Sequence, residues 1–149
     1  MTVSTRRRTA EALVAAFNNM DVDTIISYRS PNCIRRFLPL SMGLGEQDNA
    51  TYRTSLLKLR AIFHNFSLKI SDLIEDDTAN RICLSLKARA DTVAGEYVNE
   101  YMWLLDFDKT GTKITLSQEY SDTVMERDFS PKLKAAMAKQ QAARTNGSS

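Results

Sequence analysis

The stretch that decides the fold is Gly95-Glu-Tyr-Val-Asn-Glu-Tyr-Met-Trp-Leu-Leu-Asp-Phe-Asp108, followed by Lys109-Thr110-Gly111 and then by Thr112-Lys-Ile-Thr-Leu-Ser-Gln-Glu-Tyr-Ser-Asp122. The two long segments form a predicted pair of antiparallel strands, and the short polar segment forms the turn between them. The turn fixes which residues face each other, so it decides which polar side chains share a face of the sheet.

A loop centred on Lys109-Thr110 predicts three facing pairs, which are Phe107 with Thr112, Trp103 with Leu116, and Glu100 with Glu119. Asp106 and Lys113 also face each other in this register, and their opposite charges support it. A three-residue loop with a bulge would shift the pairing by one residue.

This register sorts the side chains onto two faces, because neighbouring residues along a strand point in opposite directions. One face carries Tyr97, Asn99, Tyr101, Trp103 and Leu105 beside Asp122, Tyr120, Gln118, Leu116 and Ile114. The other carries Val98, Glu100, Met102, Leu104 and Asp106 beside Ser121, Glu119, Ser117, Thr115 and Lys113. The first face has an apolar floor and a polar rim, which is typical of the wall of a small-molecule pocket.

The rest of the chain supplies helices first and strands afterwards. Apolar spacing and capping residues predict helices over 5–19, from Asp21 through Ile26, and from Asp48 or Asn49 through Phe63. Between them we expect a turn at 30–32, a short strand at 33–39 and a loop at 40–47. Alternation predicts strands over 66–74 and 81–90, ahead of the pair described above. A terminal helix over about 130–141, starting at Ser130 or Pro131, precedes a frayed tail from 142 to 149.

Helices followed by four antiparallel strands predict an α+β fold, with three N-terminal helices packed against one face of a curved sheet. A length of 149 residues indicates a single domain over 1–149 with a substantial core. The net charge of +2 is close to balance, and the basic run Arg6–Arg8 is typical of a solvated helix end. We therefore expect no nucleic-acid partner.

The residues that commonly bind metals are scarce. Cys33 and Cys83 are far apart and the chain holds one histidine, so no metal site is predicted. No glycine-rich phosphate loop or serine-nucleophile motif occurs, and we expect chemistry without a cofactor. No apolar run approaches membrane-spanning length and no signal peptide is evident, which predicts a cytoplasmic protein without a membrane partner.

The order of elements, with Phe17-Asn-Asn-Met-Asp-Val-Asp23 and Ser30-Pro-Asn-Cys33 at their places in it, resembles the NTF2-like, SnoaL-type family. The chain is similar to the fungal branch of that family in four segments, Ser27–Cys33, Leu38-Pro39, Asn99–Met102 and Glu119–Asp122. Members of this branch act in secondary-metabolite pathways on polyketides or meroterpenoids. The resemblance covers nearly the whole chain. It implies a cone-shaped fold, with a pocket closed by the helices and an outer sheet face that forms dimers.

The resemblance also implies an acid/base aspartate at the end of the last strand, at the position of Asp122. Two features of related branches are missing. The ketosteroid-isomerase branch has a tyrosine and an aspartate where this chain has Leu13 and Phe37, which argues against that apparatus. The fungal branch often has a histidine where this chain has Arg35, which argues against a histidine base there.

Several candidates for catalysis follow, each with an alternative. Asp122 either takes a proton next to a carbonyl, while a tyrosine or asparagine donates to the enolate, or it caps the strand end or pairs with an arginine. Glu100 and Glu119 either share a proton as an acid/base dyad or are neutralised by an arginine or a partner chain. His64, the one histidine, lies either at the mouth of the cone or on the surface at a helix end.

The predicted substrate-binding residues are donors and aromatic side chains, namely Tyr28, Arg29, Arg35, Arg53, Asn99, Tyr101, Trp103 and Tyr120. The arginines have the alternative of pairing with acidic neighbours.

The combined expectation is a cofactor-free isomerase or cyclase that acts by side-chain acid/base chemistry. Its substrate would be a small hydrophobic polycyclic or polyketide-type intermediate, of polyketide or meroterpenoid origin, and it would work as a homodimer through the sheet face. The alternative is a non-catalytic NTF2-like module that binds a ligand or mediates dimerisation. A cavity that holds at least two ionisable groups favours the enzyme, and a cone filled by side chains favours the module.

Overall fold

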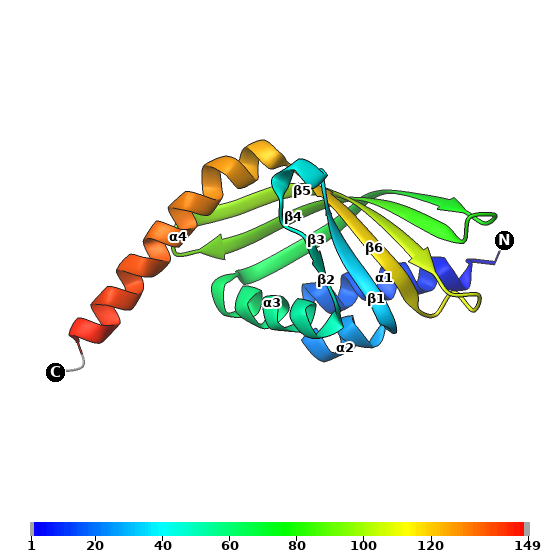
Figure 1. The fold of residues 1–149 in the computed structure, drawn as a ribbon, viewed down its shortest axis with the longest axis horizontal. Helices are drawn as coiled ribbons and strands as arrows, with labels where there is room; N and C mark the ends of the chain where they lie inside the picture. The colour runs from blue at the N-terminus through cyan, green and yellow to red at the C-terminus, as the bar shows by residue number, and fades with distance from the viewer. Residues whose placement is uncertain (1, 148–149) are drawn as a thin grey trace.

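The computed structural model describes residues 2–147, which form four α-helices and one six-stranded sheet (Figure 1). The helices are α1 (Thr5–Asn18), α2 (Val22–Ser27), α3 (Asn49–Ile62) and α4 (Thr123–Asn146), with a 3-10 turn η1 (Leu40–Met42). The strands are β1 (Arg29–Leu38), β2 (Glu46–Gln47), β3 (His64–Asp76), β4 (Arg81–Thr92), β5 (Gly95–Phe107) and β6 (Ile114–Ser121).

The sheet has the strand order β2-β1-β6-β5-β4-β3. Strands β3 to β6 form the predicted antiparallel series, and β1 joins it by pairing parallel with β6. Helices α1, α2 and α3 lie on one side of the curved sheet, whereas α4 extends away from the end of β6 (Figure 1). The predicted α+β fold is therefore confirmed.

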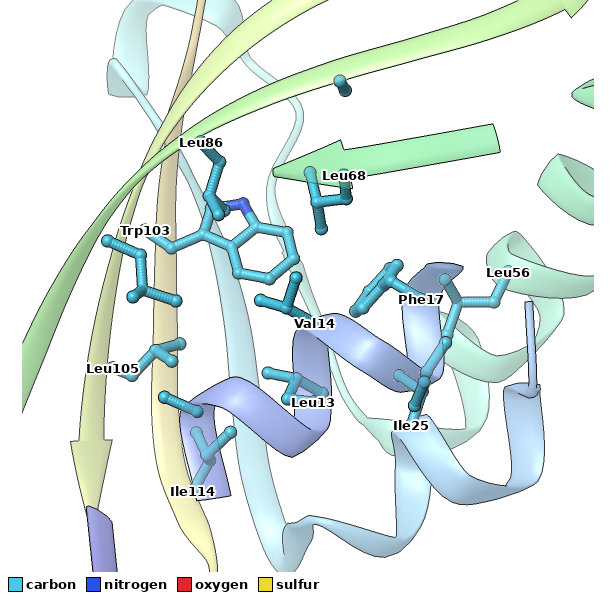
Figure 2. Packing of buried hydrophobic residues seen from close by; sticks show 14 of the residues in the cluster. Leu13, Val14, Phe17, Ile25, Leu56, Leu68, Leu86, Trp103, Leu105 and Ile114 are labelled. Atoms are coloured by element: carbon cyan, nitrogen blue, oxygen red, sulfur yellow. The ribbon is translucent and has the colours of Figure 1, made fainter. Parts of the chain in front are cut away.

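The core forms where α1 and α2 pack against the inner face of the sheet. Leu13, Val14 and Phe17 of α1 point toward Trp103 and Leu105 of β5 (Figure 2). The rings of Phe17 and Trp103 lie 5.2 Å apart between centroids. The alternation predicted for β5 is confirmed, because Tyr97, Asn99, Trp103 and Leu105 are all buried. Full burial of a large side chain contributes about 1.5–3 kcal/mol, so this face anchors the helical layer.

The predicted register of the β5–β6 pair is wrong. Trp103 faces Glu119, three residues further along than the predicted Leu116. The turn is longer than predicted because Asp108 bonds to Lys113 through its backbone and Gly111 adopts a left-handed φ of 72°, so that β6 begins only at Ile114. A bulge lies between Asp106 and Phe107. An odd shift exchanges the two faces of a strand, so Glu119 points inward and Tyr120 outward.

Two predicted element boundaries are also wrong. Residues 30–32 belong to β1 rather than to a separate turn, although the β1–β6 register is irregular between Arg29 and Ile34. The terminal helix starts at Thr123 and not near Pro131, because the Asp122 carboxylate accepts hydrogen bonds from the backbone N–H groups of Val124 and Met125. It continues to Asn146, through most of the predicted frayed tail, whose last two residues lie outside the described part of the chain.

The other predicted helix starts hold, with one exception. Asp21 caps α2 and Asp48 caps α3, whereas Ser4, rather than Thr5 or Thr9, caps α1. Within residues 2–147, no helix has both the length and the apolar character that a membrane crossing needs.

Candidate active site

A cavity of about 300 Å³ lies between the inner face of the sheet, α3 and the first half of α4. Its walls are mostly apolar and include Phe17, Leu56, Leu59, Phe63, Phe66, Phe129 and Leu133. Met42 and the exposed Leu44 contribute from the segment between β1 and β2. Two groups of polar residues interrupt this lining.

The first group, the arginine cluster, consists of Arg35, Glu119, Tyr52 and Arg29. Arg35 on β1 and Glu119 on β6 lie on adjacent strands, and Arg35 Nε donates to Glu119 Oε1 over 2.6 Å. Arg35 also donates to Gln47 Oε1 over 3.0 Å. Both members of the pair are largely withdrawn from water, with side-chain exposures of 17% and 11%. Burial acts to lower the pKa of Arg35, but Glu119 and Tyr52 outweigh it and hold that pKa above its ordinary value.

Arg29 adds a second buried cation to this cluster. The ring of Tyr52 lies against both guanidinium groups, 4.8 Å from that of Arg29 and 4.3 Å from that of Arg35. Arg29 donates to two neutral oxygens, Asn49 Oδ1 at 2.8 Å and Ser117 Oγ at 2.9 Å, and its Nη2 has no partner among residues 2–147. Burial lowers the pKa of Arg29. With two guanidinium groups to one carboxylate, the cluster favours negative charge on a bound molecule.

The second group, the tyrosine cluster, consists of Tyr97, Asn99 and Tyr101 on β5 and Glu126 on α4. Asn99 Nδ2 donates to both Tyr97 Oη and Glu126 Oε1, each over 2.9 Å. The hydroxyl groups of Tyr97 and Tyr101 are hydrogen-bonded to each other. Ser130, one turn further along α4, donates to Glu126 Oε2 over 3.3 Å.

Within residues 2–147, the hydrogen-bond partners of the Glu126 carboxyl group are therefore neutral. Burial raises the pKa of Glu126, and hydrogen bonds from Ser130 and Asn99 oppose this shift without cancelling it. The negative charge of Glu119 raises the same pKa further. Burial also raises the pKa of Tyr97 to about 12 and holds the pKa of Tyr101 well above its ordinary value, so both phenols keep their protons at neutral pH.

The chain is similar to several known proteins in sequence and in structure. Core atranone cluster (CAC) protein 11 of Stachybotrys chlorohalonatus is 30% identical over 131 residues, which cover 88% of this chain and 98% of that protein. The BvnE pinacolase structure from Penicillium brevicompactum is 27% identical with a TM-score of 0.84, covering 89% of this chain and 96% of that one. No model of a known protein family matches the sequence.

A structure from Shewanella denitrificans, described as a SnoaL-like polyketide cyclase, has a TM-score of 0.70 at 10% identity and shares the fold. It covers 83% of this chain and 94% of that one. The chain belongs to the NTF2-like, SnoaL-type family. Within the family it falls in the fungal branch, which also includes Austinoid biosynthesis cluster protein H of Aspergillus calidoustus, 29% identical over 131 residues that cover 85% of this chain and 89% of that protein.

The structure brings together six of the predicted residues of this NTF2-like site. Arg35, Tyr101, Trp103 and Glu119 line the cavity, Asn99 lies beneath it in the tyrosine cluster, and Arg29 borders a small recess behind the arginine cluster. Trp103 Nε1 has no hydrogen-bond partner among residues 2–147. Arg29, Asn99 and Glu119 are the buried charged or amide side chains of this region.

The structure places the two leading catalytic candidates elsewhere. Asp122, the residue at the family's acid/base position, is exposed, caps α4 and does not line the cavity. Its catalytic role stays a prediction. Glu100 is exposed on the outer face opposite Lys87, so the predicted Glu100–Glu119 pairing is wrong. The cause is the shifted register, and Arg35 neutralises Glu119, as one alternative had it.

The remaining candidates lie away from the cavity. His64 is exposed at the start of β3, and Arg53 forms an ion pair with Asp23. Tyr28 ends α2 and packs against the core, while Tyr120 is 50% exposed on the outer face.

Glu126 is the functional candidate that the sequence prediction missed. It follows the capping residue Asp122 by four positions, and Ser130 and Leu133 follow at helical spacing on the same wall of the cavity. A helix start at Asp122 would have placed Glu126 in the first turn, where it lies beside Asn99 in the first half of β5.

Proposed function

We propose that this NTF2-like chain is an isomerase or cyclase that uses side-chain acid/base chemistry, without a cofactor, on a polyketide or meroterpenoid intermediate. The observation that carries this proposal is that two carboxylates line one cavity in contrasting surroundings. Glu119 is ion-paired with Arg35, whereas burial raises the pKa of Glu126. Pairs of titratable groups with contrasting environments are typical of acid/base sites.

In the proposed reaction, the Glu126 carboxylate takes a proton from a carbon next to a substrate carbonyl. The C–H electron pair moves to the carbonyl oxygen and forms an enolate, whose charge the excess cation of the arginine cluster stabilises. Glu126 then returns the proton to a different carbon in an isomerisation. In a cyclisation the enolate carbon attacks a second carbonyl carbon of the same molecule, the π electrons of that C=O bond move to its oxygen, and Glu126 returns the proton to the alkoxide so formed. A raised pKa makes Glu126 a stronger base for this task.

The lining of the cavity supports the substrate class. Aromatic and aliphatic side chains form most of the wall, and the polar groups gather at two places. Such a site suits a mainly hydrocarbon skeleton with few oxygens. The cavity is open and holds two carboxylates, which favours an enzyme over a non-catalytic binding module.

We also propose that the outer sheet face forms a homodimer. Met102 and Tyr120 face each other on β5 and β6 and are 43% and 50% exposed, and Val98 further along β5 is 52% exposed. Adjacent exposed apolar side chains on a sheet mark a surface for association. Sedimentation of the wild type beside Met102→Lys would test this.

Co-expression with the neighbouring biosynthetic genes in a fungal host tests the proposed reaction. With the wild type we expect a product that is absent without the chain, and with Glu126→Gln a fall of about 100-fold or more, because a positioned base contributes about that much. Glu96→Gln, at an exposed glutamate of β5 that does not line the cavity, is the matched control. Full product with Glu126→Gln would contradict the proposal.

A further inference from the structure

The orientation of the Asn99 amide is fixed by the backbone around it. Its Oδ1 accepts from the N–H of Glu100 over 2.8 Å and from the N–H of Asp122 over 3.2 Å. Backbone N–H groups can only donate, so the oxygen of the amide must face them. The Nδ2 group therefore faces the tyrosine cluster, where its two hydrogens are used by Tyr97 and Glu126.

The hydrogen bond from Asn99 determines which way the hydroxyl hydrogen of Tyr97 points. Tyr97 Oη accepts from Asn99, and its one other partner within residues 2–147 is the hydroxyl of Tyr101. Tyr97 is buried with an exposure of 6%, and its hydroxyl group lies at the wall of the cavity with Asn99 Nδ2 and Tyr101 Oη as its protein partners. Buried donors find acceptors, and here the available acceptor is Tyr101 Oη. Tyr97 consequently donates to Tyr101.

The hydrogen of the Tyr101 hydroxyl group then points into the cavity. Tyr101 lines the cavity, and among residues 2–147 its hydroxyl has no hydrogen-bond partner besides Tyr97. The carboxylates of Glu119 and Glu126 act on Tyr101 through their charge. Since Tyr101 keeps its proton at neutral pH, it presents an O–H donor beside the arginine cluster.

We infer that Tyr101 donates a hydrogen bond to a carbonyl oxygen of the substrate, and that Asn99 is a positioning residue that sets this direction through Tyr97. A carbonyl or enolate oxygen fits because it accepts without bringing a competing hydrogen. This rests on the proposed function for the chemistry, in which that oxygen gains the enolate charge. Tyr101 then donates to the oxygen, the positive charge of the nearby arginine cluster stabilises the enolate, and Glu126 moves the proton.

The C=O stretch of bound 2-acetylnaphthalene, measured by infrared spectroscopy, tests the donor. In the wild type the band should lie at lower frequency than in hexane, because the carbonyl accepts a hydrogen bond. Tyr101→Phe should abolish most of this shift, whereas Tyr97→Phe should retain it, since Tyr101 still donates. Failure of the wild type to bind or shift the ketone would overturn the inference.

Asn99→Asp tests the direction of the chain at nearly constant volume. The introduced carboxylate accepts from Tyr97, so Tyr101 turns to donate to Tyr97 and most of the shift should be lost while the ketone stays bound. A retained shift in Asn99→Asp, or a lost one in Tyr97→Phe, would overturn the role of Asn99. If Asn99 had only a structural role, the infrared shift would not differ in this way between Asn99→Asp and Tyr97→Phe.

A neutron structure of the deuterated wild type provides a second measurement without variants. It should place one deuteron on Tyr97 Oη, directed at Tyr101, and another on Tyr101 Oη, directed into the cavity. The reverse arrangement would overturn the inference. Neither readout needs turnover. The activity of Glu126→Gln tests the proposed function, whereas the infrared shift tests this inference, so that failure of one is distinguishable from failure of the other.

Discussion

The arginine cluster and the tyrosine cluster contact the same cavity but differ in what they can change. The arginine cluster joins β1, α3 and β6 and is held by the ion pair between Arg35 and Glu119. Its guanidinium groups keep their positive charge. The tyrosine cluster joins β5 to α4 through hydrogen bonds from neutral side chains, and it contains the carboxyl group of Glu126, whose pKa burial has raised. One end of the site therefore supplies constant positive charge, and the other supplies a proton that can move.

The largest effect should come from breaking the ion pair. Arg35→Met leaves Glu119 buried without its cation, and loss of one partner of a buried pair costs about 3–5 kcal/mol. Urea unfolding would measure the free energy of unfolding. Arg53→Met, which breaks the exposed pair with Asp23, is the matched control and should cost at most about 1 kcal/mol.

Equal losses in these two variants would contradict a buried, structurally essential ion pair. The double variant Arg35→Met, Glu119→Leu sharpens the test, because it removes both charges together. It should be more stable than Arg35→Met alone.

The next effect concerns the junction between β6 and α4. Asp122→Ala removes a helix cap and should lower the free energy of unfolding by about 0.5–2 kcal/mol. Asp122→Asn keeps a capping oxygen and should preserve most of this stability and the product yield. A loss of product with Asp122→Asn in a stable protein would support the catalytic role that family resemblance predicts for this residue.

The smallest expected effect is a dependence of stability on pH that arises from Glu126 in the tyrosine cluster. The pKa of Glu126 is higher in the folded chain, so its contribution to stability is complete below the unfolded pKa and is lost as pH rises through the folded pKa. Glu126→Gln removes this loss. Its stability relative to the wild type should therefore increase between about pH 4 and about pH 8 in urea titrations. A constant difference would contradict the raised pKa.

Most of the fold follows from patterns within single elements. The alternation along β5 correctly predicted the inward Asn99, Tyr101 and Trp103, because side-chain direction in a strand depends on that strand alone. The partner strand was placed wrongly, because its register depends on hydrogen bonds of the 108–113 turn that residue types do not reveal. The predicted register therefore placed Glu119 on the outer face, whereas the structure buries it.

The candidate site was harder to predict, because it depends on contacts between distant elements. The helix start predicted at Ser130 or Pro131 left Glu126 outside the last helix, although a helix can contain an interior proline at the cost of a backbone hydrogen bond. Here the Asp122 cap and the hydrogen bond between Asn99 and Glu126 hold the first turns. Neither contact is visible from spacing alone.

The most direct test of the central claim, that Glu126 is the base, is the rate of product formation by purified protein as a function of pH. The wild-type rate should rise with pH and level off above the pKa of Glu126, which burial has raised. Glu126→Gln should lack this rise and be slower by about 100-fold or more at the plateau, while Asp122→Asn should retain the rise. A rise that persists in Glu126→Gln, or that disappears in Asp122→Asn, would contradict the assignment of Glu126.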